Sequence, residues 1–323
     1  MDNLKRSQRN WFTSAELDRL AYRRTDGDWL TTHLKQPQTR FLVTWRSSHL
    51  FRATQPLSPA WLNGVEHSDL LDEAESVVLL GQCGPSVYFN LDLPSSVESY
   101  PERFSQIGQF ADLYDAGTGQ ESADAALLAV ARGLAYWHQR HIFCGTCGQP
   151  TQSDEAGHLR RCTSPTCGAR FFPRTDPAVI VLVYDDERCL LARQSNWPAR
   201  MYSVVAGFVE PGECLEETVK REVAEETGIE VTDVEYRSSQ PWPFPSSLML
   251  GFRARAVGVE IDLSDDELET AYWFTRRQLV DAVGQGELRV PSRVSISYRL
   301  VEEWFDAGEE GPLSALADAV EGA

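Results

Sequence analysis

The chain has no apolar run of roughly 18 residues, the length that a membrane-spanning helix needs. It opens with MDNLKRSQRN, which contains no apolar signal segment, so we expect a cytoplasmic protein that does not bind membranes. Basic residues are also scarce, because 30 Lys and Arg face 48 Asp and Glu and the formal net charge is −18. This balance argues against general nucleic-acid binding, since contacts to phosphate carry most of that affinity.

Recognisable catalytic nucleophiles and internal repeats are absent as well. The six histidines stand in no motif context, so neither a Ser-His-Asp nor a Cys-His arrangement can be identified. The length of 323 residues and the 42% hydrophobic content indicate a globular chain of about two domains. The chemistry must therefore be sought in the acidic and cysteine-containing motifs.

The densest acidic run lies in residues 221–226, inside a segment that predicts a helix from Leu215 to a stop at Gly228. At about 100° per residue, Glu222 and Glu226 fall in the same stripe as Val219 and Val223, whereas Glu225 falls at the edge of the polar face. A solvated charged surface is the usual explanation of an acidic helix. Here two inward carboxylates one turn apart need a cation between them, and oxygen ligands suit Mg²⁺ or Mn²⁺.

The spacing from Gly207 through Glu213 to Arg221-Glu222-Val223-x-Glu225-Glu226-x-Gly228 resembles the Nudix box without a mismatch. The resemblance implies hydrolysis of a nucleoside diphosphate linked to another group, with Glu222, Glu225 and Glu226 as catalytic metal ligands. A bound metal would neutralise charge on the pyrophosphate and lower the pKa of an attacking water. Either Glu225 or Glu226 is the expected general base, and Glu213 and Arg221 are expected to brace the loop against the helix.

The same resemblance implies two further metal ligands. One is the backbone carbonyl of Ala206, and the other is Glu267, a carboxylate shortly before Trp273. Glu269 is the rival to Glu267, because only Trp273 fixes the register.

Residues 239–247 read SQPWPFPSS, and their three alternating prolines predict a stiff loop that is neither a central strand nor a helix. Trp242 and Phe244 could simply fill a core or a dimer contact. After a Nudix box, however, this segment resembles the signature of the NADH pyrophosphatase (NudC-type) branch. The resemblance implies cleavage of NAD(H) to nicotinamide mononucleotide and AMP, removal of NAD caps from RNA, and a homodimer in which Trp242 reaches the partner's site. Substrate contacts transferred in this way are Phe172, Phe208, Gln240, Pro241, Trp242, Pro243, Phe244, Pro245, Ser246, Ser247 and Ser297.

Two cysteine pairs, Cys144 with Cys147 and Cys162 with Cys167, are each followed by glycine and can form two knuckles on one Zn²⁺. Two disulfides are the alternative, but Cys83, Cys189 and Cys214 are scattered singly, which favours a reducing compartment. Four thiolates close the coordination sphere, so one structural zinc per subunit is expected. The NudC-type branch carries a zinc ribbon at this place.

The fold expected is α/β (α+β): a Nudix α/β/α sandwich with a mixed sheet, preceded by a zinc ribbon and a mixed N-terminal domain. We place a Nudix-like α+β domain at 1–140, the ribbon at 141–175, the Nudix domain at 176–306 and an acidic flexible tail at 307–323. Strands are predicted at 41–45, 77–80, 87–91, 178–184, 189–193, 202–206, 248–256 and 271–274, and further helices at 124–140, 277–283 and 293–305.

The principal hypothesis is therefore a Mg²⁺- or Mn²⁺-dependent NAD(H) pyrophosphatase with NAD-capped RNA as a larger substrate. An RNA chain would follow the basic parts of the chain, which are residues 1–52 and, in the ribbon, Arg160, Arg161, Arg170 and Arg174. One alternative is a Nudix hydrolase of another dinucleotide such as ADP-ribose. The other is a nucleotide- or RNA-binding module without catalysis.

Overall fold

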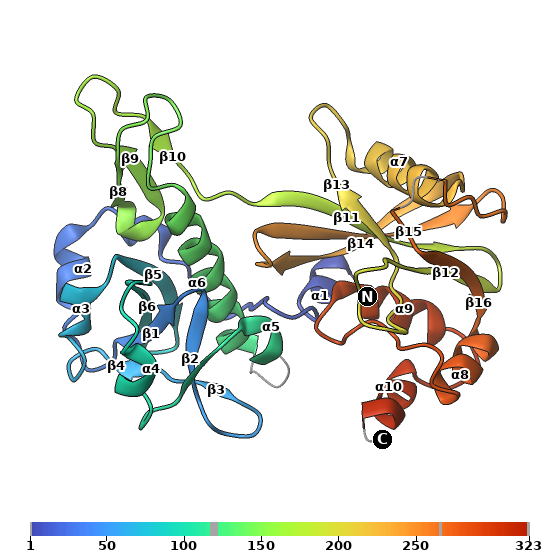
Figure 1. Cartoon of the computed structure of the whole chain (residues 1–323), viewed down its shortest axis with the longest axis horizontal. Coiled ribbons are helices and arrows are strands. Elements are labelled where there is room, and N and C mark those ends of the chain that lie inside the picture. The colour runs from blue at the N-terminus through green and yellow to red at the C-terminus, as the bar shows by residue number, and fades with distance from the viewer. Residues whose placement is uncertain (1, 117–121, 265–266, 322–323) are drawn as a thin grey trace. The chain divides into compact units, whose positions relative to one another are not determined.

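A computed structural model describes residues 2–116, 122–264 and 267–321 of the chain (Figure 1). Contacts between residues divide the chain into two compact units. The first unit comprises residues 1–11, 176–240 and 247–323, and the second comprises residues 12–175 and 241–246. Among the described residues, no helix is both long and apolar enough to span a bilayer.

A mixed six-stranded sheet forms the centre of the first unit. Its strands are β11 (Asp176–Tyr184), β12 (Arg188–Arg193), β13 (Val205–Phe208), β14 (Val231–Trp242), β15 (Ser247–Ala256) and β16 (Thr270–Thr275). The order is β14-β15-β11-β12-β16, with β13 paired to β11. β11 runs parallel to β15 and antiparallel to β12, which confirms the predicted mixed sheet.

Helices cover both faces of this sheet because β11 is apolar on both sides. Val179, Val181 and Val183 pack with α7 (Leu215–Thr227), whereas Ile180 and Leu182 pack toward α8 (Arg276–Gly284) and α9 (Ile296–Phe305). The alternation follows from the two-residue period of a strand. In Figure 1, α7 lies above the sheet and α8 and α9 lie below it, which confirms the predicted sandwich.

The second unit contains a seven-stranded mixed sheet. Its strands are β1 (Arg40–Trp45), β2 (Ser48–Arg52), β3 (Ser58–Pro59), β4 (Leu62–Asn63), β5 (Ser76–Cys83), β6 (Ser86–Leu93) and β7 (Gln109–Ala111). The path is β3-β2-β1-β6-β5, with β4 on β1 and β7 on β2. Helix α6 (Ser122–Arg140) packs on this sheet, where Gln139 donates to the carboxylate of buried Asp92.

A separate three-stranded sheet in the same unit, β10-β9-β8, carries the cysteines. Its strands are β8 (Thr151–Asp154), β9 (Leu159–Cys162) and β10 (Arg170–Phe171). The 3-10 turn η2 (Glu155–Gly157) lies between β8 and β9. The remaining helices earlier in the chain are α1 (Asn3–Ser7), α2 (Gly27–His33), α3 (Leu70–Glu73), α4 (Tyr100–Arg103) and α5 (Leu113–Ala116), with the 3-10 turn η1 (Ala21–Arg23).

Three of the differences from the predicted boundaries have a local cause. β13 begins at Val205, because Ser203 pairs with Ala192 on β12 instead of continuing along β11. α9 begins at Ile296, where the Ser295 side chain caps the helix. β14 continues through Pro241 and Trp242, which its position at the sheet edge allows, because an edge residue can lack an N–H.

The tail from residue 307, which we expected to be flexible, contains helix α10 (Leu313–Glu321). Leu313 and Ala317 are buried in the core that α8 and α9 share, and Leu316 packs against it. Leu313, Leu316 and Ala317 recur at the three- and four-residue spacing of an apolar helix face, which the acidic and small-residue composition of the tail made hard to recognise.

Candidate functional site

Helix α7 is defined at both ends by local interactions. At its start the Cys214 N–H donates to the Glu217 carboxylate at 2.9 Å, forming a capping box. At its end Gly228 adopts a left-handed φ of 70°. Glu222 and Glu226 are only 9% and 3% exposed. The predicted helix and its inward carboxylate pair are therefore confirmed.

The box glycine lies where Glu222 reaches the sheet. Gly207 pairs with Val179 across β13 and β11. A Cβ built on Gly207 would lie 1.9 Å from the Glu222 Cδ and 2.2 Å from each of its carboxylate oxygens. Only glycine leaves room for this carboxylate, so the strand fixes where Glu222 can lie.

Arg221 ties the preceding loop to the helix. Its guanidinium donates to both oxygens of Glu213, at 2.5 and 2.9 Å, and to the carbonyl of Phe208 at 3.0 Å. It also donates to Glu222 at 2.8 Å and to Glu225 at 2.9 Å. These contacts confirm the expected brace. They hold the pKa of Glu213 at about 2, with the Arg221 hydrogen bond as the largest cause, and they raise the pKa of Arg221.

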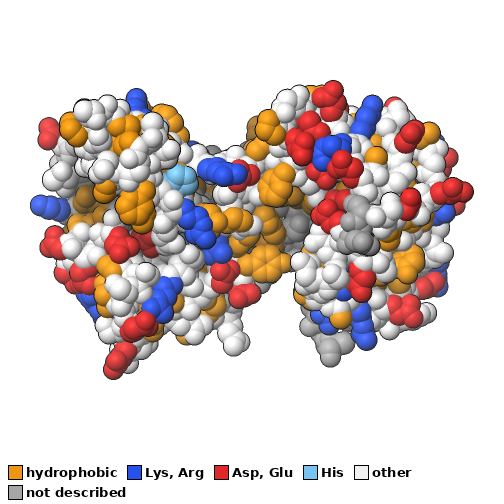
Figure 2. Space-filling view, turned by 45° about the horizontal axis from the view of Figure 1, so that its top comes forward, with side chains coloured by type: hydrophobic (Ala, Val, Ile, Leu, Met, Phe, Trp, Pro, Cys, Tyr) orange, Lys and Arg blue, Asp and Glu red, His pale blue; other side chains and the backbone are white. Residues whose placement is uncertain are grey.

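Figure 2, in which the upper side of Figure 1 comes forward, shows acidic side chains gathered around basic ones on the first unit. The Arg221 network has this character, with one guanidinium shared by three carboxylates. A fixed bidentate fork of this kind orients carboxylates more strictly than a lysine could.

The remaining acidic candidates occupy different environments. Burial raises the pKa of Glu222, the Arg221 contacts oppose that shift, and the charges of Glu225 and Glu267 add to it. Glu267 is thus close enough to act on Glu222. Glu269 instead forms an ion pair with Arg193 at 2.5 Å. Of the two rivals, Glu267 is therefore the one whose charge acts on the α7 carboxylate Glu222.

These groups fit a hard divalent cation. Glu222 and Glu226 offer buried carboxylate oxygens one turn apart, an arrangement that is costly without a positive charge between them. Glu225 has a side chain that is 57% exposed. Ala206, the source of the predicted carbonyl ligand, directly precedes Gly207 on β13.

Gln240 and Ser297, two predicted substrate contacts, face the protein interior. Gln240 is 1% exposed, donates to the carbonyls of Val294 and Trp11, and accepts from the Ile296 N–H at 2.7 Å. Ser297 is 1% exposed and its hydroxyl lies 2.9 Å from that of Ser295. Both side chains hold the start of α9, and Ser247 is also buried.

The aromatic residues of the 239–247 segment, hereafter the recognition segment, form a cluster within the second unit. The Trp242 and Phe244 rings lie 5.1 Å apart, centroid to centroid, and both contact Phe12 and Tyr114 edge-on. Pro243 is buried, Pro241 and Ser246 are half-buried, and Pro245 is exposed. Phe12 and Tyr114 carry no sequence signal for this role, because they are distant in the chain and stand in no motif.

Phe172 and Phe208 are the exposed aromatic members of the predicted set, at 62% and 59%. Phe208 follows Gly207 on β13 in the first unit, and Phe172 follows β10 in the second. Exposed aromatic rings have faces available for a nucleotide base, unlike buried ones.

Four sulfur atoms converge in the ribbon. The Sγ atoms of Cys144, Cys147, Cys162 and Cys167 all lie within 4.8 Å of one another, with two pairs at 3.4 and 3.8 Å. A tetrahedron with Zn–S bonds of about 2.3 Å has edges of about 3.8 Å, so this set fits zinc. Gly148 and Gly168, at φ values of 74° and 59°, turn the two knuckles.

The basic residues of the ribbon are already engaged. Arg160 is 8% exposed and bonds to Thr151 and to His138, so it cannot serve as a surface contact for phosphate. Arg161 pairs with Asp154 and Arg170 with Glu155, in partly exposed ion pairs. The expected basic surface is therefore smaller than the sequence indicated.

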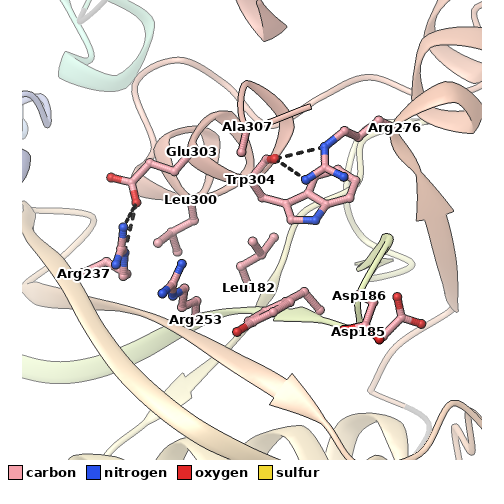
Figure 3. A pocket seen from close by; sticks show the side chains of 11 residues that line it. Leu182, Asp185, Asp186, Arg237, Arg253, Arg276, Leu300, Glu303, Trp304 and Ala307 are labelled. Atoms are coloured by element: carbon pink, nitrogen blue, oxygen red, sulfur yellow. Dashed lines mark hydrogen bonds and ion pairs between the residues drawn. The ribbon is translucent and has the colours of Figure 1, made fainter. Parts of the chain in front are cut away.

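A pocket of about 210 Å³ opens on the α9 face of the sheet (Figure 3). Leu182 and Leu300 line its apolar part, the Arg276 guanidinium donates to the Trp304 carbonyl at 2.7 Å, and Arg237 pairs with Glu303 at 2.8 Å. Leu182 belongs to the face of β11 opposite α7. This pocket therefore lies across the sheet from the carboxylates.

Two family descriptions match the chain: a NUDIX domain over residues 174–293 and an NADH pyrophosphatase zinc ribbon domain over residues 139–172. The chain is 32% identical over 338 residues to the human NAD-capped RNA hydrolase NUDT12, covering 92% of this chain and 73% of that protein. It is 42% identical over 203 residues to the NAD-capped RNA hydrolase NudC of Mycobacterium bovis (60% of this chain, 64% of that one). It is 41% identical over 221 residues to the human mitochondrial NAD(P)H pyrophosphatase NUDT13 (64% and 62%). Together with the α7 carboxylates and the four-cysteine ribbon, these similarities show that the chain belongs to the Nudix hydrolase family, in its zinc-ribbon NADH pyrophosphatase branch.

Proposed function

We propose that the chain hydrolyses the pyrophosphate of NAD(H), yielding nicotinamide mononucleotide and AMP, and that it also removes NAD caps from RNA. The observation that carries this proposal is the buried pair Glu222 and Glu226 on α7, of which Glu222 is held beside Gly207 and Arg221. The relatives named above as NAD(P)H pyrophosphatase and NAD-capped RNA hydrolases support the choice of substrate.

In this proposal Glu222, Glu225, Glu226, Glu267 and the Ala206 carbonyl hold Mg²⁺ or Mn²⁺. Such a cation neutralises charge on the pyrophosphate and lowers the pKa of the attacking water. Arg221 orients Glu222 and Glu225 through its hydrogen bonds. We assign the general base to Glu225, because its carboxylate reaches solvent whereas Glu226 is enclosed.

The nucleotide is recognised by exposed or partly exposed rings. Phe208 is the candidate ring of the first unit, and Phe172, Trp242 and Phe244 are the candidates of the second. Pro241, Pro243 and Pro245 limit the conformations of the segment. Gln240, Ser247 and Ser297 are buried, and Gln240 and Ser297 hold the start of α9.

The test is incubation of the purified protein with NADH and Mn²⁺ or Mg²⁺. Both nicotinamide mononucleotide, in reduced form from NADH, and AMP should appear, and their absence with either metal would refute the proposal. Glu226→Gln should remove most turnover while the protein stays folded. Glu230→Gln changes an exposed carboxylate just beyond α7 and should leave turnover unchanged.

Two alternatives are separated by related measurements. A hydrolase of another dinucleotide would show a higher kcat/KM for ADP-ribose than for NADH or NAD⁺. A non-catalytic binding module would bind nucleotide tightly and form no product with any metal.

Decapping is tested by comparing kcat/KM for a short NAD-capped RNA and for free NADH. Arg161→Ala together with Arg170→Ala removes two partly exposed guanidiniums whose ion pairs contribute little to stability. The double variant should lose activity on the capped RNA and keep it on NADH. If the double variant matched the unchanged protein on both substrates, the RNA chain would not contact these two arginines.

Three further assignments belong to this proposal. We propose one structural Zn²⁺ per subunit, and a homodimer in which the Trp242 loop reaches the partner's site. We also propose a reducing cytoplasmic compartment, which the free cysteine thiols outside the ribbon favour. The predicted domain boundaries after residues 140 and 175 also belong to this proposal.

A further inference from the structure

We propose that the N-terminal part of the chain holds the recognition segment in its substrate-binding conformation, with Asn10 and Arg132 as positioning residues. The inference rests on the proposed NAD(H) hydrolysis and assigns a task to residues that carry no catalytic motif. Two groups of contacts support it, one within each unit.

In the first unit, Ser7, Asn10 and Trp11 contact the edge of β14 where the recognition segment begins. The Ser239 N–H donates to the Ser7 hydroxyl at 3.0 Å, and the Ser239 carbonyl accepts from the Asn10 amide at 2.9 Å. Asn10 is 4% exposed and also donates to the Ser238 hydroxyl at 3.2 Å. Because β14 is an edge strand, backbone groups that face away from β15 need such partners.

The next two residues of the segment continue this pattern. Gln240 donates to the Trp11 carbonyl at 3.2 Å. Pro241 has no N–H, so the sheet edge needs no donor partner there. Ser7, Asn10 and Trp11 thus provide partners for the Ser239 backbone and the Gln240 side chain, immediately before Pro241.

In the second unit, Arg132 of α6 holds the middle of the segment. Its Nε donates to the Pro243 carbonyl at 2.9 Å, and its guanidinium carbon lies 4.9 Å from the Phe244 ring centroid. The same guanidinium donates to the Ser47 carbonyl at 2.8 Å and pairs with Asp112 at 2.9 Å. A planar fork with four simultaneous partners cannot be reproduced by lysine.

The backbone of Phe12 also indicates that its surroundings hold the aromatic cluster in place. It is 2% exposed and has a φ of 69°, a left-handed conformation that is unfavourable for a bulky side chain. Such a residue persists only where its surroundings over-determine it, and the Trp242 and Phe244 rings are among those surroundings.

Holding the recognition segment should affect substrate binding, whereas holding the α7 carboxylates should affect cleavage. The carboxylates of α7 are held by Gly207, Glu213 and Arg221, which do not depend on Asn10 or Arg132. A recognition segment that is not held in place must be ordered when the substrate binds, which weakens binding without altering the carboxylates. Loss of either positioning residue should therefore act on KM.

The experiment compares Asn10→Ala and Arg132→Lys with the unchanged protein on NADH and on ADP-ribose, which lacks nicotinamide. Each variant should raise KM for NADH about tenfold, keep kcat within about twofold, and reduce the preference for NADH over ADP-ribose. Arg9→Ala and Arg140→Met are matched controls: Arg9 pairs with Glu302, and Arg140 stacks on Tyr136 of its own helix. Both controls should match the unchanged protein.

An unchanged KM in both variants would overturn the inference, as would a fall in kcat at constant KM, since that pattern assigns the effect to α7.

Hydrogen exchange gives a readout independent of turnover: the amides of Trp242, Phe244 and Ser246 should exchange faster in Asn10→Ala than in Arg9→Ala. Equal exchange would contradict the positioning role even if Arg132→Lys failed to fold. If the unchanged protein does not cleave NADH, the proposed function fails, and the exchange comparison still decides whether these residues hold the segment.

Discussion

Replacing Gly207 with alanine tests whether the strand fixes the position of the Glu222 carboxylate. The three nearest heavy atoms to the added Cβ all belong to Glu222, at 1.9, 2.2 and 2.2 Å. Ordinary contact with a Cβ begins at 3.4 Å. The carboxylate must therefore move by about 1.5 Å, the difference between 3.4 and 1.9 Å, or the strand must move instead.

The displacement is large on the scale of a catalytic site. A misplacement of about 1 Å costs on the order of 100-fold in rate, so Gly207→Ala should lower kcat for NADH by about 100-fold or more. Crowding a packed site by one methyl group costs about 1–3 kcal/mol, so the free energy of unfolding should fall by that amount.

Denaturant unfolding and steady-state turnover measure the two effects. Gly258→Ala is the matched control, because a Cβ at Gly258 meets nothing within 4 Å. In a Glu222→Ala background the clashing carboxylate is gone, so adding Gly207→Ala should cost little further stability. Equal destabilisation in both backgrounds, or near-normal turnover in the single variant, would refute the reasoning.

Three other changes have defined outcomes. Arg221→Lys keeps the charge but cannot bond Glu213, Glu222, Glu225 and the Phe208 carbonyl together, so kcat for NADH should fall at least about tenfold, with a smaller change in KM. Cys147→Ser should lower bound zinc, measured by atomic absorption, from one per chain toward zero, because a three-thiolate site is open. Burial raises the pKa of Asp92 to about 7 in the folded chain. The unfolded chain therefore loses this proton at lower pH than the folded chain does. The free energy of unfolding should fall as pH rises from about 4 to about 7, by up to about 4 kcal/mol. Asp92→Asn should remove that fall, as measured by denaturant unfolding at pH 5 and pH 8.

Local features of the chain were predictable because their causes are local. The helix α7 followed from its apolar period and from a glycine stop, and the direction of Glu222 and Glu226 followed from the same period. The four cysteines converge as their spacing predicted, because each knuckle needs only a few consecutive residues and a glycine.

The orientation of motif residues was not predictable from a resemblance. A motif specifies residue types, and it assigned Gln240 and Ser297 to the substrate, yet both side chains hold the start of α9. Arg160 was grouped with the ribbon arginines by sequence proximity, although alternation along β9 turns it inward against Thr151. Contacts such as those of Arg132 with Pro243 join residues more than 100 positions apart and leave no local pattern.

The matched NUDIX range, residues 174–293, is smaller than the body that the structure shows around α7. Helix α9 lies beyond that range, yet its Leu300, Val301 and Phe305 fill the core on the far face of β11. The carboxylate network of α7 needs only residues 207–226 and the strand beside them, so it is built largely within the matched range. The recognition segment, in contrast, also takes hydrogen bonds from Ser7, Asn10 and Arg132, all outside it. Cleavage and recognition therefore depend on different parts of the chain, so changes before residue 174 should alter which nucleotide is bound more than how fast its pyrophosphate is cut.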